Sequence, residues 1–572
     1  MVRQRGDDRL GSIVDDGTER VDGRAAWRTN VAAGRALADT VRTTLGPKGA
    51  DTMVITAEGK VVVTNDGTRI IDLIEISHPT AELLADLAAE QASEVGDGTT
   101  TAILLAGELL ARAEELLDRG VHPTTIAAGY HLAAERASTL LDSYAFDIRL
   151  SDRERLEALA RTIITGRWDR ESRGFLASLF VDLIGKVERE GMIEHRRITR
   201  RSIPGGRLRD STIVEGLPID TERSSTSLIT PRSRRSDRIE DATIALLDDG
   251  LRIETADGLE RVSLDGPEDR QELLAYEDSI YAEQADRVAA TGANVLFCQQ
   301  SIDDPVTYLL AERGILAVER TRRDELIQLA RATGARHVGA IAELSSAEVG
   351  HAGVLERRRV GGRELLVLSE CAGNEQLSLL LRGGPEHVVE ELDRIAGSCL
   401  RALGLAIGGR GVLPGGGACQ IRLAGDLRAE ARGVDGREQL AIEAFADALE
   451  AIPWTLAENA GLDPIDAITE LRARHHARET GAGLTFDAGA GSESGAIGDA
   501  LANGVIGPLA VPRQAIESAT EAAMTLVRVD DVIAAERDQS GGENEHDDHD
   551  HGPGGLESTG GYPWAVGHSM GH

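Results

Sequence analysis

The spacing of apolar residues changes character twice along this chain. The first 150 residues are dominated by helical spacing, whereas from about Thr212 strand-like runs alternate with helices. After Leu381 the helical spacing returns. A domain inserted into another produces this order, and a chain of 572 residues exceeds the size of one hydrophobic core. The sequence therefore predicts a multidomain protein in which both ends of the chain are mainly helical.

Turn-forming residues mark the ends of the expected elements. A helix over 25–45 ends at a Gly-Pro turn, and strands over 52–56 and 60–64 are predicted to form a hairpin. The other expected helices cover 80–117, 123–144, 156–187 with an interruption at 165–167, 267–291, 323–333, 385–405, 438–461 and 463–476, and further strands cover 243–247 and 294–298.

Charge and composition exclude several classes of protein. The formal net charge is -34, and lysine occurs only at Lys48, Lys60 and Lys186, so bulk nucleic-acid binding is disfavoured. A surface this acidic and poor in lysine suits the salt-rich cytoplasm of a halophile; an ordinary acidic protein would explain the charge but not the missing lysines. The four cysteines form no CxxC pair, and no apolar run approaches the roughly 18 residues that cross a membrane. We expect a soluble, cytoplasmic protein.

The segment VGDGTTT (95–101) directly precedes a helix-forming run. Its glycines let the backbone approach an anion at the start of a helix, where free N–H groups and the helix dipole favour negative charge. Asp97 is placed to hold a hard cation such as Mg²⁺ against phosphate oxygens, and the threonines supply hydroxyl donors. On spacing alone, a capped helix after a glycine turn remains the commoner interpretation.

Two further glycine clusters could contact the same ligand. LGPKG (45–49) resembles a second phosphate cradle, and PGGGA (414–418) lies more than 300 residues farther along the chain. A plain turn is the alternative for each. The motif GxxxxGK[ST] occurs nowhere, so a P-loop enzyme is not supported. A metabolic enzyme acting on a nucleotide or a phosphorylated small molecule would explain the glycine loops but not the inserted mixed domain.

These clusters belong to longer segments that resemble the group II chaperonins, the thermosome and its cytosolic eukaryotic relatives. The resemblance runs from about residue 22 to residue 537. Its segments are TVRTTLGPKGADTM (40–53), VVVTNDGTRII (61–71), EVGDGTTTAILLAGELL (94–110), ATGANVLFCQQSIDD (290–304), GILAVER (314–320), RGGPEHVVEELDR (382–394), VLPGGGA (412–418), LAENAGLDPIDAI (456–468) and AIESATEAAMTLVRVDDVIAA (515–535).

The resemblance implies a chaperonin fold with a mainly α equatorial domain, α/β intermediate and apical domains, and a helical protrusion that acts as a built-in lid. The alternative for the protrusion is a core helix.

The tail histidines His546, His549 and His551 could bind a transition metal, the alternative being a solvated tail. The implied segments are equatorial 23–150 and 405–536, intermediate 151–213 and 370–404, and apical 214–369 with the lid around 256–290. Residues 1–22 and 537–572 show no sustained apolar period, so a disordered arm and a disordered tail are expected there.

The resemblance also implies a function and its partners. Family members bind ATP and Mg²⁺, assemble into double rings and enclose unfolded proteins. This chain is therefore expected to be a chaperone subunit that acts on unfolded proteins in a homo- or hetero-oligomeric ring with paralogous subunits. Nucleic-acid and membrane partners are not expected.

Carried over position by position, the resemblance assigns roles to individual residues. Asp97 holds Mg²⁺, Asp66 helps to position the attacking water, and Arg167 stands where many members have a lysine that reaches the γ-phosphate. The expected nucleotide and phosphate contacts are Leu45, Gly46, Pro47, Gly49, Gly98, Thr99, Thr100, Thr101 and Gly416.

The sequence departs from the family at the principal catalytic carboxylate, where Ser398 replaces an aspartate. Serine is no comparable proton acceptor at neutral pH, so a general-base contribution of typically ~10²- to 10⁴-fold is expected to be missing. On a helix, Asp393 lies about 140° around the axis from Ser398 and Glu391 about 10 Å along it, so neither can substitute without rearrangement. Binding of nucleotide is not excluded by this change.

A second departure is Ala502, at the place of a glutamate near the nucleotide's sugar, with Asn503 as another hydrogen-bonding candidate. Together the two departures leave an alternative open. The chain could be a structural or regulatory ring subunit that binds nucleotide with weak or no ATP hydrolysis.

Overall fold

The computed structural model describes residues 19–57, 59–164, 166, 168–189, 192–193, 197–220, 238–253, 267–372, 376–486 and 496–534. The chain forms two units, residues 1–23 with 531–572, and residues 24–530. In the first unit, β1 (Glu19–Asp22) pairs antiparallel with β20 (Asp531–Ala534). Residues 19–22 therefore form a strand and not the predicted disordered arm. Their partner lies at the other end of the chain, so no local pattern could reveal the pairing.

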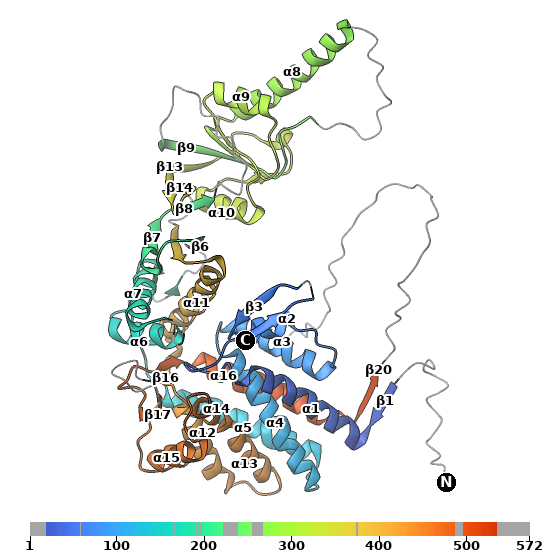
Figure 1. Ribbon diagram of the computed structural model, residues 1–572, viewed down its shortest axis with the longest axis vertical. Coiled ribbons are helices and arrows are strands. Elements are labelled where there is room, and N and C mark those ends of the chain that lie inside the picture. Colours follow the sequence, from blue (N-terminus) through green and yellow to red (C-terminus); the bar gives the residue numbers. More distant parts are fainter. Residues whose placement is uncertain are drawn as a thin grey trace, which may run out of the picture. The chain divides into compact units, whose positions relative to one another are not determined.

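In the second unit, helices from the two ends of the sequence share one apolar core, as the sequence predicts (Figure 1). The core is almost entirely aliphatic, and its aromatic contact joins Tyr130 to Phe445 edge to face with ring centroids 5.8 Å apart. The contributing helices are α1 (Gly23–Arg42), α2 (Gly67–Leu73), α3 (Pro79–Glu94), α4 (Thr99–Asp118), α5 (Pro123–Tyr144), α12 (Ala418–Ala431), α13 (Glu438–Leu449), α14 (Ala451–Asn459) and α16 (Ala510–Val527). A smaller cluster beside it includes α15 (Pro464–His476).

Two expected helices are each divided in the structure. The predicted helix over 80–117 is interrupted by the VGDG turn, which separates α3 from α4. The predicted helix over 438–461 is interrupted at Glu450, between α13 and α14. Pro453 explains the second break, because its ring nitrogen cannot donate a helical hydrogen bond to the preceding turn.

The predicted hairpin is present as β2 (Thr52–Ile55) and β3 (Val61–Thr64). Met53 pairs with Val63 and Ile55 pairs with Val61, so these four side chains share one face of the hairpin. All four are more than half exposed. We call this surface the hairpin face; an apolar strip of this kind commonly marks a contact with another protein.

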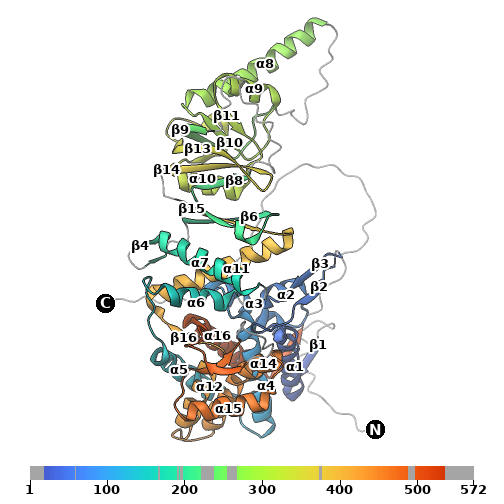
Figure 2. The ribbon, with the colours of Figure 1, turned by 60° about the vertical axis from the view of Figure 1, so that its left-hand side comes forward.

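A second core joins α6 (Arg153–Ile163), α7 (Arg170–Val187) and α11 (Glu386–Leu405) to a three-stranded sheet (Figure 2). The central strand, β15 (Leu377–Gly383), runs parallel to β6 (Ile198–Pro204) and antiparallel to β7 (Thr212–Glu215). Strands β7 and β15, which pair with each other, flank the inserted segment in sequence. The chain therefore enters and leaves the insertion through neighbouring strands of one sheet.

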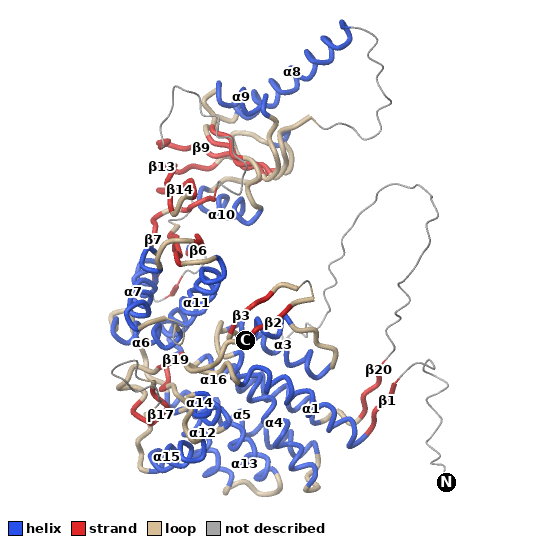
Figure 3. The backbone as a smooth tube through the Cα atoms, viewed as in Figure 1, coloured by secondary structure: helices blue, strands red, loops and turns tan. Residues whose placement is uncertain are grey.

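The inserted segment is built on a seven-stranded mixed sheet with helices on both faces (Figure 3). Ile244 and Leu246 pack with α10 (Arg323–Thr333), whereas Ala245 and Leu247 pack with α8 (Pro267–Ala290) and α9 (Asp304–Glu312). The strand order is β11 (Leu316–Val318), β10 (Val295–Cys298), β9 (Arg238–Leu247), β13 (Gly350–Val360), β14 (Arg363–Cys371) and β8 (Leu217–Asp220), and β12 (His337–Val338) pairs with β9.

Helix α8 matches the helix predicted for the lid segment, whose earlier residues 254–266 lie outside the described residues. Its middle turns expose Leu273, Leu274 and Tyr276 to solvent. Within the described part of the chain, no helix combines the length and the apolar character that crossing a membrane requires.

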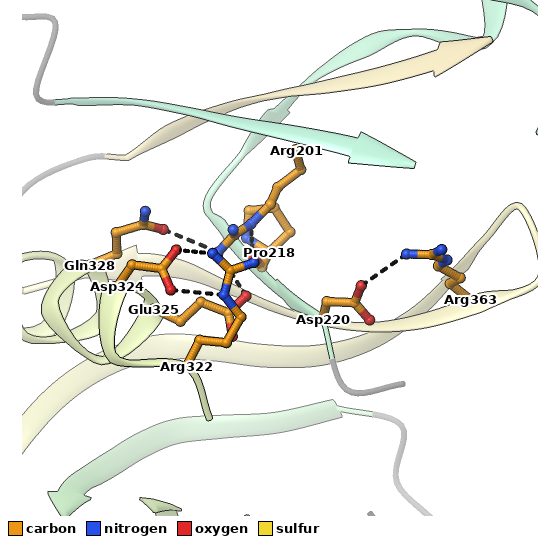
Figure 4. Close-up of polar contacts among 8 residues, drawn as sticks. All are labelled: Arg201, Pro218, Asp220, Arg322, Asp324, Glu325, Gln328 and Arg363. Atoms are coloured by element: carbon orange, nitrogen blue, oxygen red, sulfur yellow. Dashed lines mark hydrogen bonds and ion pairs between the residues drawn. The ribbon is translucent and has the colours of Figure 1, made fainter. Parts of the chain in front are cut away.

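The three-stranded and seven-stranded sheets are joined by a small apolar cluster and by a buried ion pair. Ile203 of β6 packs with Leu365 of β14 in the cluster. Arg201 of β6 reaches α10, where its Nη2 lies 3.0 Å from Oε1 of Glu325 (Figure 4). Arg201 also donates to the Pro218 carbonyl and to Gln328. One strand of the smaller sheet thus carries the main polar contact to the larger one.

Candidate functional site

A cavity of about 1230 Å³ lies where α4, α11 and α12 begin or pass each other. The three glycine clusters all reach it, although the third lies more than 300 residues from the other two in sequence. Gly49 is not among its lining residues, and Arg167 lies outside the described residues. The predicted residues that line it are Leu45, Gly46, Pro47, Asp66, Asp97, Gly98, Thr99, Thr100, Thr101, Ser398 and Gly416.

Helix α4 begins at this cavity without a side-chain cap. Its N-cap residue Gly98 has φ +79°, in the left-handed region, and makes no capping hydrogen bond. A Cβ at this position would lie 2.6 Å from Cγ1 of Val511, so only glycine fits. The first-turn N–H groups, those of Thr99, Thr100 and Thr101, are thus left for an anion at the positive end of the helix dipole.

Two side chains that the sequence did not single out hold this loop in place. Gln91 is fully buried, and its Nε2 donates to the Asp97 carbonyl at 2.9 Å and to the Val511 carbonyl at 3.3 Å. From α11, Arg401 donates to the carbonyls of Ala92 and Ser93 at the end of α3. A polar residue on the apolar face of a predicted helix is the only local signal for Gln91, and Arg401 has none.

The LGPKG turn is shaped by contacts of its backbone. The Gly49 N–H donates to the Gly46 carbonyl at 3.0 Å, and Asn459 donates to the Leu45 carbonyl at 2.9 Å. A Cβ at Gly49 would collide with the Thr44 carbonyl, so this glycine closes the turn and does not itself line the cavity. Lys48 is exposed and outside the cavity lining.

Asp66 is held by two partners at the cavity wall. It caps α2 (Gly67–Leu73), and its Oδ1 accepts from the Thr68 N–H at 2.9 Å. Its Oδ2 lies 2.7 Å from Nη1 of Arg394, whose Nη2 lies 2.6 Å from Oε1 of Glu391. The carboxylate therefore has a fixed orientation toward α11.

Asp97 faces the cavity and is reached by solvent there, while the surrounding walls remove much of its hydration. This desolvation raises the pKa of the carboxyl above its ordinary value; the N–H of Gly98 and the charge of Arg394 oppose the shift, and Asp66 adds to it. The Gly98 N–H donates to Oδ1 of Asp97 at 2.7 Å. A bound divalent cation would favour the ionised form of this carboxyl.

The donor set fits Mg²⁺ held jointly with a phosphate ligand. Mg²⁺ in proteins commonly uses one or two carboxylates plus phosphate oxygens and water, and does not need an all-protein cage. Among the described residues, no group of three or more His, Cys, Asp or Glu side chains forms a metal cluster. The tail histidines His546, His549 and His551 lie outside those residues.

Ser398 lies on the face of α11 that lines the cavity, with Arg394 and Arg401 about one turn away on either side. Asp393 also lines the cavity, but its carboxylate accepts from Nε of Arg200 at 2.9 Å. Glu391 is buried and paired with Arg394. Where the resemblance predicts a catalytic carboxylate, this helix presents a hydroxyl group.

The PGGGA loop lines the opposite side of the cavity. Gly416 has φ +63°, and its carbonyl accepts from the Leu484 N–H at 2.8 Å. Ala502 and Asn503 lie nearby in the lining, and Asp499 accepts from the N–H groups of Leu501 and Ala502. Nδ2 of Asn503 already donates to the Asp499 carbonyl at 2.7 Å. The side-chain oxygen of Asn503 is therefore left for a ligand.

Comparison with known proteins identifies the class to which this fold and cavity belong. The family model of the TCP-1/cpn60 chaperonins matches residues 37–537, and the chain belongs to this family. It is 43% identical over 542 residues to the thermosome subunit of Methanopyrus kandleri, covering 94% of this chain and 96% of that protein. The thermosome subunit alpha of Halobacterium salinarum is 41% identical (96% and 95% covered), and the thermosome subunit 1 of Haloferax volcanii is 42% identical (95% and 95% covered). The metabolic-enzyme alternative finds no support among these relatives.

Proposed function

We propose that this chain is a subunit of an ATP-dependent double-ring chaperonin that binds unfolded proteins and assists their folding. One observation carries the proposal. A single cavity unites three distant glycine clusters with Asp97 at the uncapped start of α4, in a chain that belongs to the chaperonin family. A plain structural turn does not require three such loops to meet around one open volume.

The phosphates of the nucleotide would lie between the start of α4 and the LGPKG turn. The free N–H groups of α4 and the threonine hydroxyls supply donors for them. Asp97 would hold Mg²⁺, which when bound neutralises phosphate charge. Gly416 and the region of Ala502 would face the rest of the nucleotide from the other side. The role predicted for Arg167 stays a prediction.

Unfolded proteins would be bound by the segment built on the seven-stranded sheet. The exposed apolar side chains of α8, at Leu273, Leu274 and Tyr276, suit recognition of apolar patches and agree with a lid at 256–290. The equatorial, intermediate and apical segments that the resemblance predicts, with boundaries near residues 150, 213, 369 and 404, are part of the same proposal.

Assembly and surroundings follow from the surface of the chain. The hairpin face suits a contact with a neighbouring subunit, either another copy or a paralogue. The net charge of -34 with three lysines suits a salt-rich cytoplasm. Equal ring assembly in 0.1 M and in molar KCl would contradict that environment.

Ser398 supports a second candidate function, that of a ring subunit which binds nucleotide but hydrolyses it weakly or not at all. Such a subunit would depend on active paralogues for the conformational cycle. Ala502, which has no side-chain donor or acceptor, also favours this second candidate function.

Steady-state ATP hydrolysis by the assembled ring in molar KCl with Mg²⁺ distinguishes the two candidates. Ser398→Asp restores a carboxylate to the cavity wall, and Ser279→Asp on exposed α8 adds the same charge away from it. If hydrolysis is weak in wild type and rises about 10²-fold or more in Ser398→Asp alone, Ser398 is a disabled catalytic position. Rapid hydrolysis by wild type would refute this reading of Ser398 and leave the chaperonin function standing.

A further inference from the structure

Strand β6 carries two consecutive arginines that serve opposite sides of the sheet. Arg201 turns to α10 and the seven-stranded sheet, as described above. Successive residues of a strand point to opposite faces. Arg200 therefore points away from α10 and toward α11, and it lines the cavity. Neither arginine belongs to a segment that resembles the family motifs.

The guanidinium of Arg200 is only partly engaged. Its Nε donates to Oδ1 of Asp393 at 2.9 Å, and both side chains are about one-third exposed, 38% for Arg200 and 33% for Asp393. In the described part of the chain, its two terminal nitrogens have no hydrogen-bond partner. An exposed pair of this kind contributes little to stability, so the guanidinium can change partners readily.

Gly397 provides the space in which this guanidinium lies. An ideal Cβ on Gly397 would lie 3.0 Å from Nη1, 3.2 Å from Cζ and 3.3 Å from Nη2 of Arg200. Glycine inside a helix weakens that helix relative to alanine, so α11 is less stable here than it could be. The guanidinium thus packs on the flank of α11, one residue from Ser398.

The terminal phosphate of a bound nucleoside triphosphate would approach the guanidinium of Arg200. Arg401 of α11 donates to the carbonyls of Ala92 and Ser93, just before the VGDG turn, so α11 passes close to the start of α4 where the phosphates are proposed to bind. The part of a triphosphate farthest from the sugar would lie between these two helices. Two free N–H ends of a planar guanidinium match phosphate oxygens in geometry and in charge.

We infer that Arg200 binds the terminal phosphate of a nucleoside triphosphate, exchanging Asp393 for that phosphate, and so makes the site prefer triphosphate over diphosphate. The inference rests on the nucleotide-binding function proposed above and names the residue that reads the terminal phosphate. It assigns Arg200 to binding and gives it no role in activating water.

Calorimetric titration of the assembled protein in molar KCl with Mg²⁺ tests this, using ADP and a non-hydrolysable ATP analogue. Arg200→Ala should weaken binding of the analogue about tenfold to a hundredfold and leave ADP binding within about twofold. Arg200→Lys should retain part of the preference, because it keeps the charge but not the fork. Arg209→Ala, which removes an exposed guanidinium outside the cavity lining, is the control and should change neither affinity.

Gly397→Ala separates the inference from general damage to the fold. Alanine should raise the melting temperature of the nucleotide-free protein by strengthening α11, yet weaken binding of the triphosphate analogue by crowding Arg200. If wild type binds the analogue but Arg200→Ala weakens both nucleotides equally, or neither, the inference is wrong and the proposed function stands. If wild type binds neither nucleotide, the proposed function fails and the inference with it.

Discussion

At the scale of single residues, Asp97 combines a proposed cation-binding role with an unfavourable environment. Desolvation raises the pKa of its carboxyl in the folded protein above the unfolded value. The folded state then binds the proton more tightly than the unfolded state does, and this contribution to stability is lost as the pH rises through the folded pKa. Above the unfolded pKa, the raised pKa of this carboxyl therefore lowers the stability of the nucleotide-free protein.

We predict that Asp97→Asn raises the melting temperature of the nucleotide-free protein at pH 7.5 while abolishing Mg²⁺-dependent nucleotide binding. The difference in melting temperature should shrink as the pH falls toward the unfolded pKa of aspartate, about 3.9. Thermal melts across this pH range, with calorimetric titration of nucleotide, provide the measurement.

Asp169→Asn is the control with the opposite sign. Hydrogen bonds from the backbone and side chain of Ser172, together with the Glu171 N–H, lower the pKa of the Asp169 carboxyl at the start of α7. Its stabilising contribution is present above the unfolded pKa, so this variant should melt lower at pH 7.5. A lower melting temperature for Asp97→Asn as well would contradict the proposed environment of Asp97.

At the scale of elements, β6 is held to α10 by a buried ion pair between Arg201 and Glu325. Glu325 is 3% exposed, and desolvation raises the pKa of its carboxyl while Arg201 and Arg322 oppose that shift. Removing one partner of a buried pair leaves the other charge unpaired in a place where water cannot solvate it. Loss of either partner is therefore expected to weaken the contact between β6 and α10.

We predict that Glu325→Ala lowers the local free energy of unfolding around α10 by about 3 kcal/mol, because Arg201, whose side chain is only 14% exposed, is left without its charge partner. Hydrogen exchange of amides in α10 and β8 should then become about a hundredfold faster. Asp324→Ala on the same helix removes only the exposed partner of Arg322 and should change exchange less than about fivefold (Figure 4). Equal effects of the two variants would show that burial of the Arg201 pair is unimportant.

At the scale of the whole molecule, the hairpin face is the surface we assign to ring assembly. An apolar strip on a two-stranded sheet leaves both side chains and strand edges free to pair with another chain. Within a ring this strip would be covered, and in an isolated subunit it would be exposed.

We predict that Ile55→Asp abolishes ring assembly without unfolding the subunit. Ile55 is 66% exposed, so its loss should change subunit stability by no more than about 0.5 kcal/mol, whereas a carboxylate buried in a subunit contact is strongly unfavourable. Sedimentation velocity in molar KCl measures assembly, and circular dichroism checks the fold. Tyr276→Asp, at a similarly exposed apolar residue of α8, should still assemble; intact rings of Ile55→Asp would remove the hairpin face from the proposed contact.

Much of the fold follows from local patterns that the sequence displays directly. The bounds of α5 and α10 and the β2–β3 hairpin agree with the prediction, because turn residues and apolar periods mark their ends. The sequence pattern predicts no break before α14, because the apolar period continues through Pro453.

Three glycine-rich loops, the helical character of both ends of the chain and the serine at position 398 are visible in the sequence alone. These depend on residue type and on near neighbours. What only the tertiary structure decided is how distant groups meet: β1 with β20, Gln91 and Arg401 with the loop before α4, and Arg200 with Asp393 over Gly397. Apart from Gln91 and Asp97, which are six positions apart, these contacts join residues more than a hundred positions apart. Their geometry is set by packing of the cores, which no local period records.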